Sequence, residues 1–107
     1  MPPSSVAPKP IEPTHNGADV HPLRFDPAQA VASENGVLVS FYGGIAPCFV
    51  LDHYTVAETA STVTITLYAG SDKTKPGVVC AAIAVEYHLD IPLQSPLGTR
   101  KVIDGAT

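Results

Sequence analysis

The chain has 107 residues, which is enough for one domain with a hydrophobic core. Its formal net charge is −4, with 6 Lys and Arg residues against 10 Asp and Glu residues, so it lacks the basic surface that binds nucleic acid or an anionic membrane. Charged residues make up only 15% of the chain. Thr, Val, Ile and Tyr are plentiful, and this composition favours strands over helices.

The first part of the chain differs in composition from the rest. Residues 1–18 contain Pro2, Pro3, Pro8, Pro10 and Pro13. Proline excludes both helix and sheet interior, so we expect residues 1–18 to form an extended, flexible tether and residues 19–107 to form one domain. Met1 leads directly into prolines and not into the basic and apolar segments of a signal peptide. We therefore expect Met1 to stand in place of an export signal or lipid-anchor segment.

The pattern becomes strand-like after residue 19. A short edge segment is expected at Leu23–Phe25, between two prolines. The next two segments, Gln29–Ser33 and Val37–Tyr42, are joined across Asn35-Gly36, a pair typical of a β-hairpin turn.

Further strands are expected to the end of the chain. Phe49–Glu58 carries apolar residues on both faces, which indicates a central strand or a bulge that exchanges the faces. Alternation is clearest in Thr62–Ala69, where Val63, Ile65, Leu67 and Ala69 share one face. A turn-rich loop at Gly70–Gly77 precedes a long strand over residues 79–91, and Arg100–Ile103 forms the last one.

No helix of ordinary length fits this pattern. Six or seven short strands separated by turn signals are typical of a sandwich or a small barrel. The sequence therefore predicts an all-β fold, an immunoglobulin-like β-sandwich of about seven short antiparallel strands.

Cys48 and Cys80 are the only cysteines, and each is expected near the start of a strand. A bond between them would place the protein in an oxidising compartment outside the cytosol. A redox-active pair is disfavoured because the cysteines are far apart in the sequence. A metal site and two free thiols remain as alternatives to an intramolecular disulfide.

Candidate chemistry elsewhere is sparse. His53 follows Asp52, and His88 follows Glu86 after one residue, so the two histidines would form a copper or zinc site if their strands were adjacent. No Gly-x-Ser-x-Gly element is present, and no catalytic residue or cofactor is predicted. A small hydrolase, with a site assembled only in space, is the weakest hypothesis.

From Val37 onward the chain resembles a family of small exported proteins and lipoproteins of actinobacteria. The segments that carry this resemblance are Phe41–Gly44, Pro47–Asp52, Val63–Gly70, Cys80–Glu86 and Pro96–Gly105. The resemblance implies export and a Cys48–Cys80 bridge, but it implies no activity. Members often begin with a lipid-anchored cysteine and a spacer rich in Pro and Ser; this chain has the spacer and lacks that cysteine.

Arg100 is the candidate for a structural ion pair. It lies close in sequence to Asp104, and strand carboxylates such as Asp52 are possible partners. Gly43-Gly44 is expected to allow a chain reversal or a bulge.

The functional expectation is a non-catalytic β-sandwich, extracellular or at the cell envelope. It would bind an unknown protein or an envelope component, and it would contact a membrane only through a lipid anchor that this chain lacks. A metal-handling protein that uses His53 and His88 is the alternative.

Overall fold

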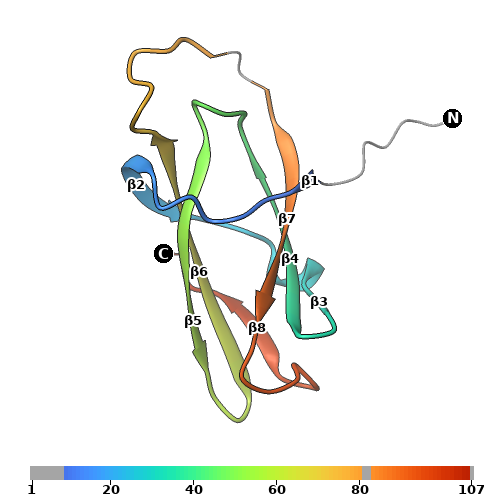
Figure 1. The fold of residues 1–107 in the computed structure, drawn as a ribbon. Helices are drawn as coiled ribbons and strands as arrows, with labels where there is room; N and C mark the ends of the chain where they lie inside the picture. Colours follow the sequence, from blue (N-terminus) through green and yellow to red (C-terminus); the bar gives the residue numbers. More distant parts are fainter. Residues whose placement is uncertain (1–8, 81–82, 107) are drawn as a thin grey trace, which may run out of the picture.

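Two β-sheets face each other in the computed structural model, which describes residues 9–80 and 83–106 (Figure 1). The first sheet has the order β1-β7-β4-β3, and in the second β2-β6-β5 lie side by side while β8 pairs with β6. The strands of the first sheet are β1 (Lys9–Pro10), β3 (Val31–Ala32), β4 (Gly36–Gly43) and β7 (Val85–Pro92). Those of the second are β2 (Gly17–Leu23), β5 (Val50–Glu58), β6 (Thr62–Asp72) and β8 (Lys101–Asp104).

The core lies between the sheets and follows from alternation along the strands. In β6 the side chains of Val63, Ile65 and Leu67 are fully buried, whereas the threonines between them are partly exposed. Each such side chain contributes roughly 1.5–3 kcal/mol by leaving water. The facing sheet supplies the other half of the core, with Val37, Val39, Phe41, Leu89 and Ile91.

The all-β sandwich with one disulfide is confirmed, but not every strand pair is antiparallel. β1 runs parallel to β7, and β8 runs parallel to β6. Parallel neighbours need a long connection. The connection from β1 to β7 spans most of the chain, and the connection from β6 to β8 includes all of β7. Turn signals in the sequence report only short connections, so they did not predict either pair.

The boundary of the expected tether is wrong for residues 9–18. Residues 9–16 cross the open side of the sandwich from β7 to β5 (Figure 1), and we refer to them as the N-terminal strap. The N–H of Ile11 donates to His88 O at 3.1 Å, and those of Thr14 and His15 donate to β5 carbonyl oxygens at 2.9 and 3.0 Å. The prolines limit β1 to two residues but do not prevent these edge contacts. Residues 1–8 lie outside the described residues.

The strand expected over residues 79–91 begins only at Val85. Val79 is 95% exposed and Ile83 is 51% exposed, so these two residues of the apolar alternation do not face the core. The reason is the partner strand: β4 ends at Gly43, which pairs with Val85. Without a neighbour, the segment before Val85 cannot form a ladder. Residues 81 and 82, which fall in the expected strand, lie outside the described residues.

The hairpin expected across Asn35-Gly36 is present as β3 and β4. Ser33 and Gly36 exchange both backbone hydrogen bonds, so the turn residues are Glu34 and Asn35, one position earlier than expected. The bulge expected between Phe49 and Glu58 lies at Asp52, where the pairing of β5 with β6 shifts. β6 continues to Asp72, three residues into the loop expected at Gly70–Gly77.

Gly43 is required by an aromatic contact and not by a chain reversal. A Cβ at Gly43 would overlap the ring of Phe49. That ring stacks on Tyr87 with centroids 5.6 Å apart, and the Tyr87 hydroxyl donates to Gly44 O at 2.6 Å. The two glycines therefore let Phe49 close the end of the core above β4 and β7.

Candidate functional site

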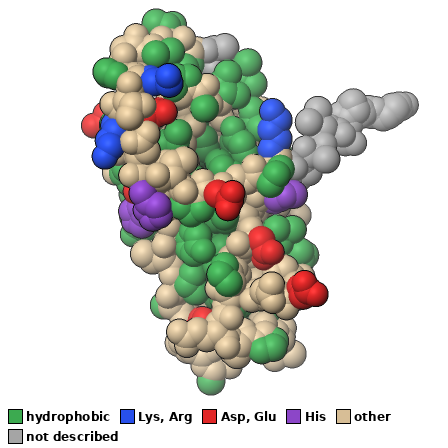
Figure 2. All heavy atoms as spheres, viewed as in Figure 1, with side chains coloured by type: hydrophobic (Ala, Val, Ile, Leu, Met, Phe, Trp, Pro, Cys, Tyr) green, Lys and Arg blue, Asp and Glu red, His purple; other side chains and the backbone are tan. Residues whose placement is uncertain are grey.

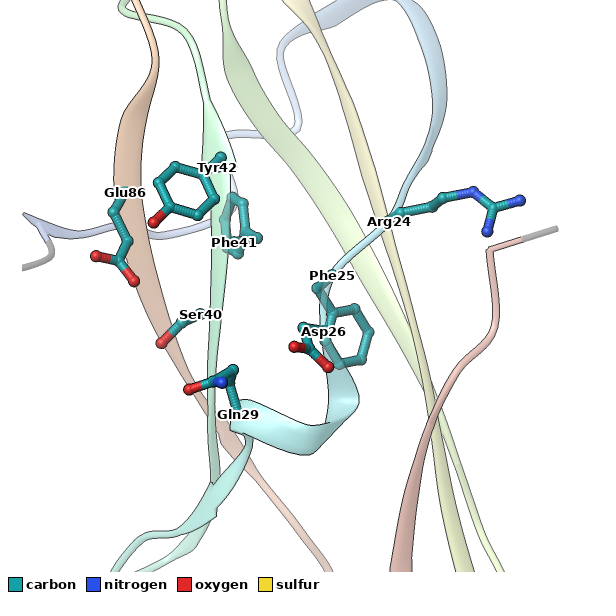
Figure 3. Close-up of a pocket in the computed structure, with 8 residues that line it drawn as sticks. All are labelled: Arg24, Phe25, Asp26, Gln29, Ser40, Phe41, Tyr42 and Glu86. Atoms are coloured by element: carbon teal, nitrogen blue, oxygen red, sulfur yellow. The ribbon is translucent and has the colours of Figure 1, made fainter.

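A cleft of about 560 Å³ lies along one edge of β4. Its walls come from β4, from β7 and from the connection between β2 and β3 (Figure 3). The residues that line it are Arg24, Phe25, Asp26, Gln29, Ser40, Phe41, Tyr42 and Glu86.

The short hairpin creates this cleft. β3 pairs only with Val37 and Leu38 of β4, so no strand of the described chain pairs with β4 beyond Leu38 on that side. The connection at residues 24–29 forms the opposite wall. Phe25 anchors it by inserting its ring into the core, and the Phe25 N–H donates to Asp104 Oδ2 at 3.2 Å.

A short 3₁₀ helix, Pro27–Gln29, shapes the far end of this wall. Asp26 caps it, since its Oδ1 accepts from the Ala28 N–H at 3.0 Å, and Pro27 supplies a backbone angle suited to the first helical position. The second carboxylate oxygen of Asp26 remains available to a ligand. Gln29, at the end of the helix, points its amide into the cleft (Figure 3).

The β4 wall presents polar side chains and an aromatic ring. Tyr42 is 65% exposed and pairs across the strands with Glu86, while Ser40 pairs with His88. Figure 3 shows the Glu86 carboxylate and the Tyr42 hydroxyl on the same side of β4, whereas the Arg24 guanidinium points away. Within the described residues, no hydrogen bond holds the side chains of Ser40, Tyr42 or Glu86. The cleft therefore presents donors and acceptors that a ligand can use.

A second cleft, of about 630 Å³, lies where the N-terminal strap meets β7. His88 and Asp90 line it together with Pro10, Ile11 and Tyr54. Asp90 is already engaged, because its Oδ1 accepts from the Ser33 hydroxyl at 2.6 Å. This cleft is more apolar than the first and contains fewer free polar groups.

His53 and His88 lie in different sheets, β5 and β7, and are not brought together. Figure 2 shows histidines at two separate places on the face drawn. The His53 ring stacks on Tyr68 with centroids 4.4 Å apart, and its Nδ1 donates to Asp52 Oδ2 at 2.6 Å. No group of three potential His, Cys, Asp or Glu ligands occurs in the described residues.

The Asp52 carboxylate is an anchor for the chain and not a partner of Arg100. The His53 hydrogen bond, followed by the N–H of Gly17 at 2.8 Å, lowers the pKa of Asp52. Gly17 opens β2, so Asp52 fixes the point at which the strap turns into that strand. Arg100 lies at the other end of β5, beside Glu58, so the ion pair expected between Asp52 and Arg100 does not form.

Arg100 pairs with Glu58 and not with the expected Asp104 or Asp52. Its Nη1 lies 3.1 Å from Glu58 Oε1, and only 10% of the arginine side chain is exposed. Its other N–H groups donate to the carbonyl oxygens of four residues: Thr59, Ser95, Pro96 and Leu97. Asp104 instead accepts from the N–H groups of Phe25 and Ala106. Lys101, the residue after Arg100, pairs with Thr62 at the start of β6, so Arg100 lies beside the β5–β6 turn. Glu58 is the last residue of β5 and therefore lies at the same turn, whereas Asp104 and Asp52 lie elsewhere.

Cys48 and Cys80 form the expected disulfide, with their Cα atoms 6.1 Å apart. Both lie in loops before β5 and β7, although Cys80 was expected inside a strand that begins at residue 79. The bond joins the two loops at one end of the sandwich. Neither cysteine lines the cleft beside β4.

The cleft was not predicted from the sequence. Ser40 and Tyr42 alternate with the buried Val39 and Phe41, and this alternation places both on the outer face. The missing information was the length of β3, because only an edge strand of two residues leaves β4 open. No local signal sets that length.

Comparisons of the chain with models of protein families, with curated proteins and with solved structures gave no match. Within the described part of the chain, no helix has the length and hydropathy needed to cross a membrane.

Proposed function

We propose that this β-sandwich is a non-catalytic binding module of the cell envelope, and that its ligand occupies the cleft between β4 and residues 24–29. The single observation that carries the proposal is the set of free polar side chains around an exposed tyrosine in that cleft. Ligand sites combine an apolar or aromatic surface with a few unpaired polar groups that fix orientation. Tyrosine is also enriched at the contact surfaces of proteins.

Two observations support a location of the protein outside the cytosol. The Cys48–Cys80 disulfide persists in oxidising compartments and is rare in the reducing cytosol. The resemblance to small exported proteins of actinobacteria, with a proline-rich start of the chain, points to display at the envelope. Each supports the compartment independently of the cleft.

The test compares labelled wild-type protein with cleft variants for binding to envelope fractions of actinobacterial cells. We expect Tyr42→Ala and Glu86→Ala each to weaken binding by about tenfold, the loss typical of a central contact residue. Thr55→Ala is the matched control, because Thr55 is exposed on β5 in the other sheet. Equal binding by the cleft variants and the control would contradict the proposed site.

Two further measurements test the alternatives. Elemental analysis of the purified protein checks the metal hypothesis for His53 and His88, and stoichiometric copper or zinc would overturn the non-metal assignment. A panel of chromogenic ester, phosphate and glycoside substrates checks the hydrolase hypothesis. Turnover that Ser40→Ala abolishes would replace the binding function with a catalytic one.

A further inference from the structure

We infer that the cleft accepts an extended, positively charged segment of a partner protein, which adds to the open edge of β4 as a further strand. This inference rests on the proposed function and names the class of its ligand. It is carried by the backbone of β4, by the shape of the cleft and by the charges around it.

The backbone groups on the open edge belong to Ser40 and Tyr42. Ser33 and Gly36 exchange two hydrogen bonds, which sets the phase of the antiparallel ladder on the β3 side of β4. Bonded residues alternate along such a strand, so the even-numbered residues of β4 direct their N–H and C=O groups toward this side. The register of β4 is continuous from Gly36 to Gly43, so the phase holds at Ser40 and Tyr42. No strand of the described chain pairs with them there.

An unpaired strand edge is a template for another strand. The open stretch covers five residues, Val39–Gly43, or about 17 Å at ~3.4 Å per residue. A cleft volume of about 560 Å³ accompanies this edge, with the Phe41 ring at its base and residues 24–29 as the far wall. The site therefore fits an extended chain and not only a compact small molecule.

The charges favour a basic segment. The carboxylates of Asp26 and Glu86 line the cleft, and the Arg24 guanidinium points away from it (Figure 3). A Lys or Arg side chain directly across from Tyr42 would lie on the same outer face. It would contact the exposed ring and come within reach of Glu86. The net charge of −4 on the whole chain attracts such a segment at longer range.

A second copy of this chain is a poorer occupant. Two β4 edges brought together would also bring together the Asp26 and Glu86 carboxylates of both copies, and like charges across paired strands are destabilising. A partner with the opposite charge avoids this repulsion. We therefore assign the edge to a different, basic protein segment.

The test uses the peptide acetyl-Val-Lys-Val-Lys-Val-amide and the amide NMR spectrum of the full chain. Binding is expected to shift the amide signals of Ser40 and Tyr42 most, and to slow their exchange with solvent. Two further peptides carry N-methyl groups, one on both lysines and one on all three valines. Alternate N–H groups of a strand point to opposite edges, so one methylated peptide keeps its affinity and the other loses about tenfold or more.

Two protein variants complete the design. Ser40→Pro removes an N–H from the open edge without removing a bond to β7, and Ser40→Thr is its control. We expect only the proline variant to lose the peptide, and Glu86→Lys to weaken it by about tenfold. If Ser40→Pro fails to fold, the methylated peptides still test the wild-type chain.

Equal binding of both methylated peptides, equal binding of acetyl-Val-Glu-Val-Glu-Val-amide, or signal shifts confined to other strands would overturn the inference. Shifts at Ser40 and Tyr42 that grow with protein concentration alone would assign the edge to a second copy instead. If the cleft variants reduce envelope binding but the lysine peptide does not bind, only the ligand class is wrong. If they leave envelope binding unchanged, the proposed function itself fails.

Discussion

The two ends of the sandwich are held together by different interactions. At the end where β4 stops and β7 starts, the disulfide joins the loops that precede β5 and β7. At the other end Arg100 holds the loop after β7 against the β5–β6 turn through Glu58 and four carbonyl oxygens. One end depends on a covalent bond, and the other on a nearly buried guanidinium.

The two ends are held differently because a different part of the chain at each end has no neighbouring strand to pair with. Ile83 and Ala84, directly before Val85, have no neighbouring strand in the described part of the chain, so no strand pairing fixes their position, and the covalent bond at Cys80 restrains this end of the loop. The loop after β7 contains backbone carbonyl groups without ladder partners, and Arg100 has five N–H donors to satisfy them. A cross-link therefore substitutes for pairing at one end, and a side chain substitutes for it at the other.

Removing the cross-link should produce the largest effect. Replacing Cys48 and Cys80 together with Ala frees a loop of 31 residues between them, and the chain-entropy estimate for such a loop is roughly 3–4 kcal/mol of unfolding free energy. Urea unfolding of the variant and of the wild type measures this loss. The wild type with reductant should match the variant, and a variant as stable as the oxidised wild type would contradict the role of the bond.

Replacing Arg100 should have the next largest effect. In Arg100→Ala the four carbonyl oxygens and Glu58 lose their common donor, so we expect the melting temperature to fall by several degrees. Arg100→Lys keeps the charge but has fewer donors in a different geometry, and its melting temperature should lie between the other two. Thermal unfolding followed by circular dichroism measures all three proteins. An unchanged melting temperature for Arg100→Ala would show that the loop is held by other contacts.

Acid should weaken both ends through their carboxylates. The N–H of Gln94 and then Arg100 lower the pKa of Glu58 below its ordinary value of 4.5. The Thr74 hydroxyl and then its N–H do the same for Asp72, whose ordinary value is 3.8. A carboxylate with a lowered pKa in the folded state stabilises it above the ordinary pKa, and this contribution is lost as the pH falls through the folded-state value.

The wild type should therefore lose stability as the pH falls below about 4.5. Glu58→Gln keeps an acceptor for the Gln94 N–H but cannot be protonated, so its melting temperature should fall less steeply over the same range. Melting curves between neutral pH and pH about 3 provide the measurement. Parallel curves for the variant and the wild type would show that Glu58 contributes nothing to the acid sensitivity.

The sequence predicted the parts of the fold that local patterns determine. Alternation in Thr62–Ala69 placed Val63 and Ile65 in the core, and the turn signal at Asn35-Gly36 placed the hairpin. The disulfide followed from the presence of only two cysteines. These features depend on neighbours in sequence or on the count of one residue type.

The features that depend on distant pairing were missed. Arg100 was assigned to Asp104 by proximity in the chain, but Glu58 lies beside it in space because β8 runs parallel to β6. The cleft required the length of β3 and the position of residues 24–29, and neither has a sequence signal. The strand expected from residue 79 failed for the same reason, since its apolar pattern was correct for a strand but no partner strand extends that far.

Val79→Thr gives the smallest expected effect and tests the exposed segment at the disulfide end, with Val63→Thr as its buried counterpart. Val79 is 95% exposed and Val63 is fully buried. Val79→Thr should change the unfolding free energy by no more than about 0.5 kcal/mol, whereas Val63→Thr buries a hydroxyl and should cost about 1–3 kcal/mol. Urea unfolding measures both. A comparable loss in the two variants would mean that Val79 is buried in solution and that β7 begins at residue 79, as its alternating sequence predicts.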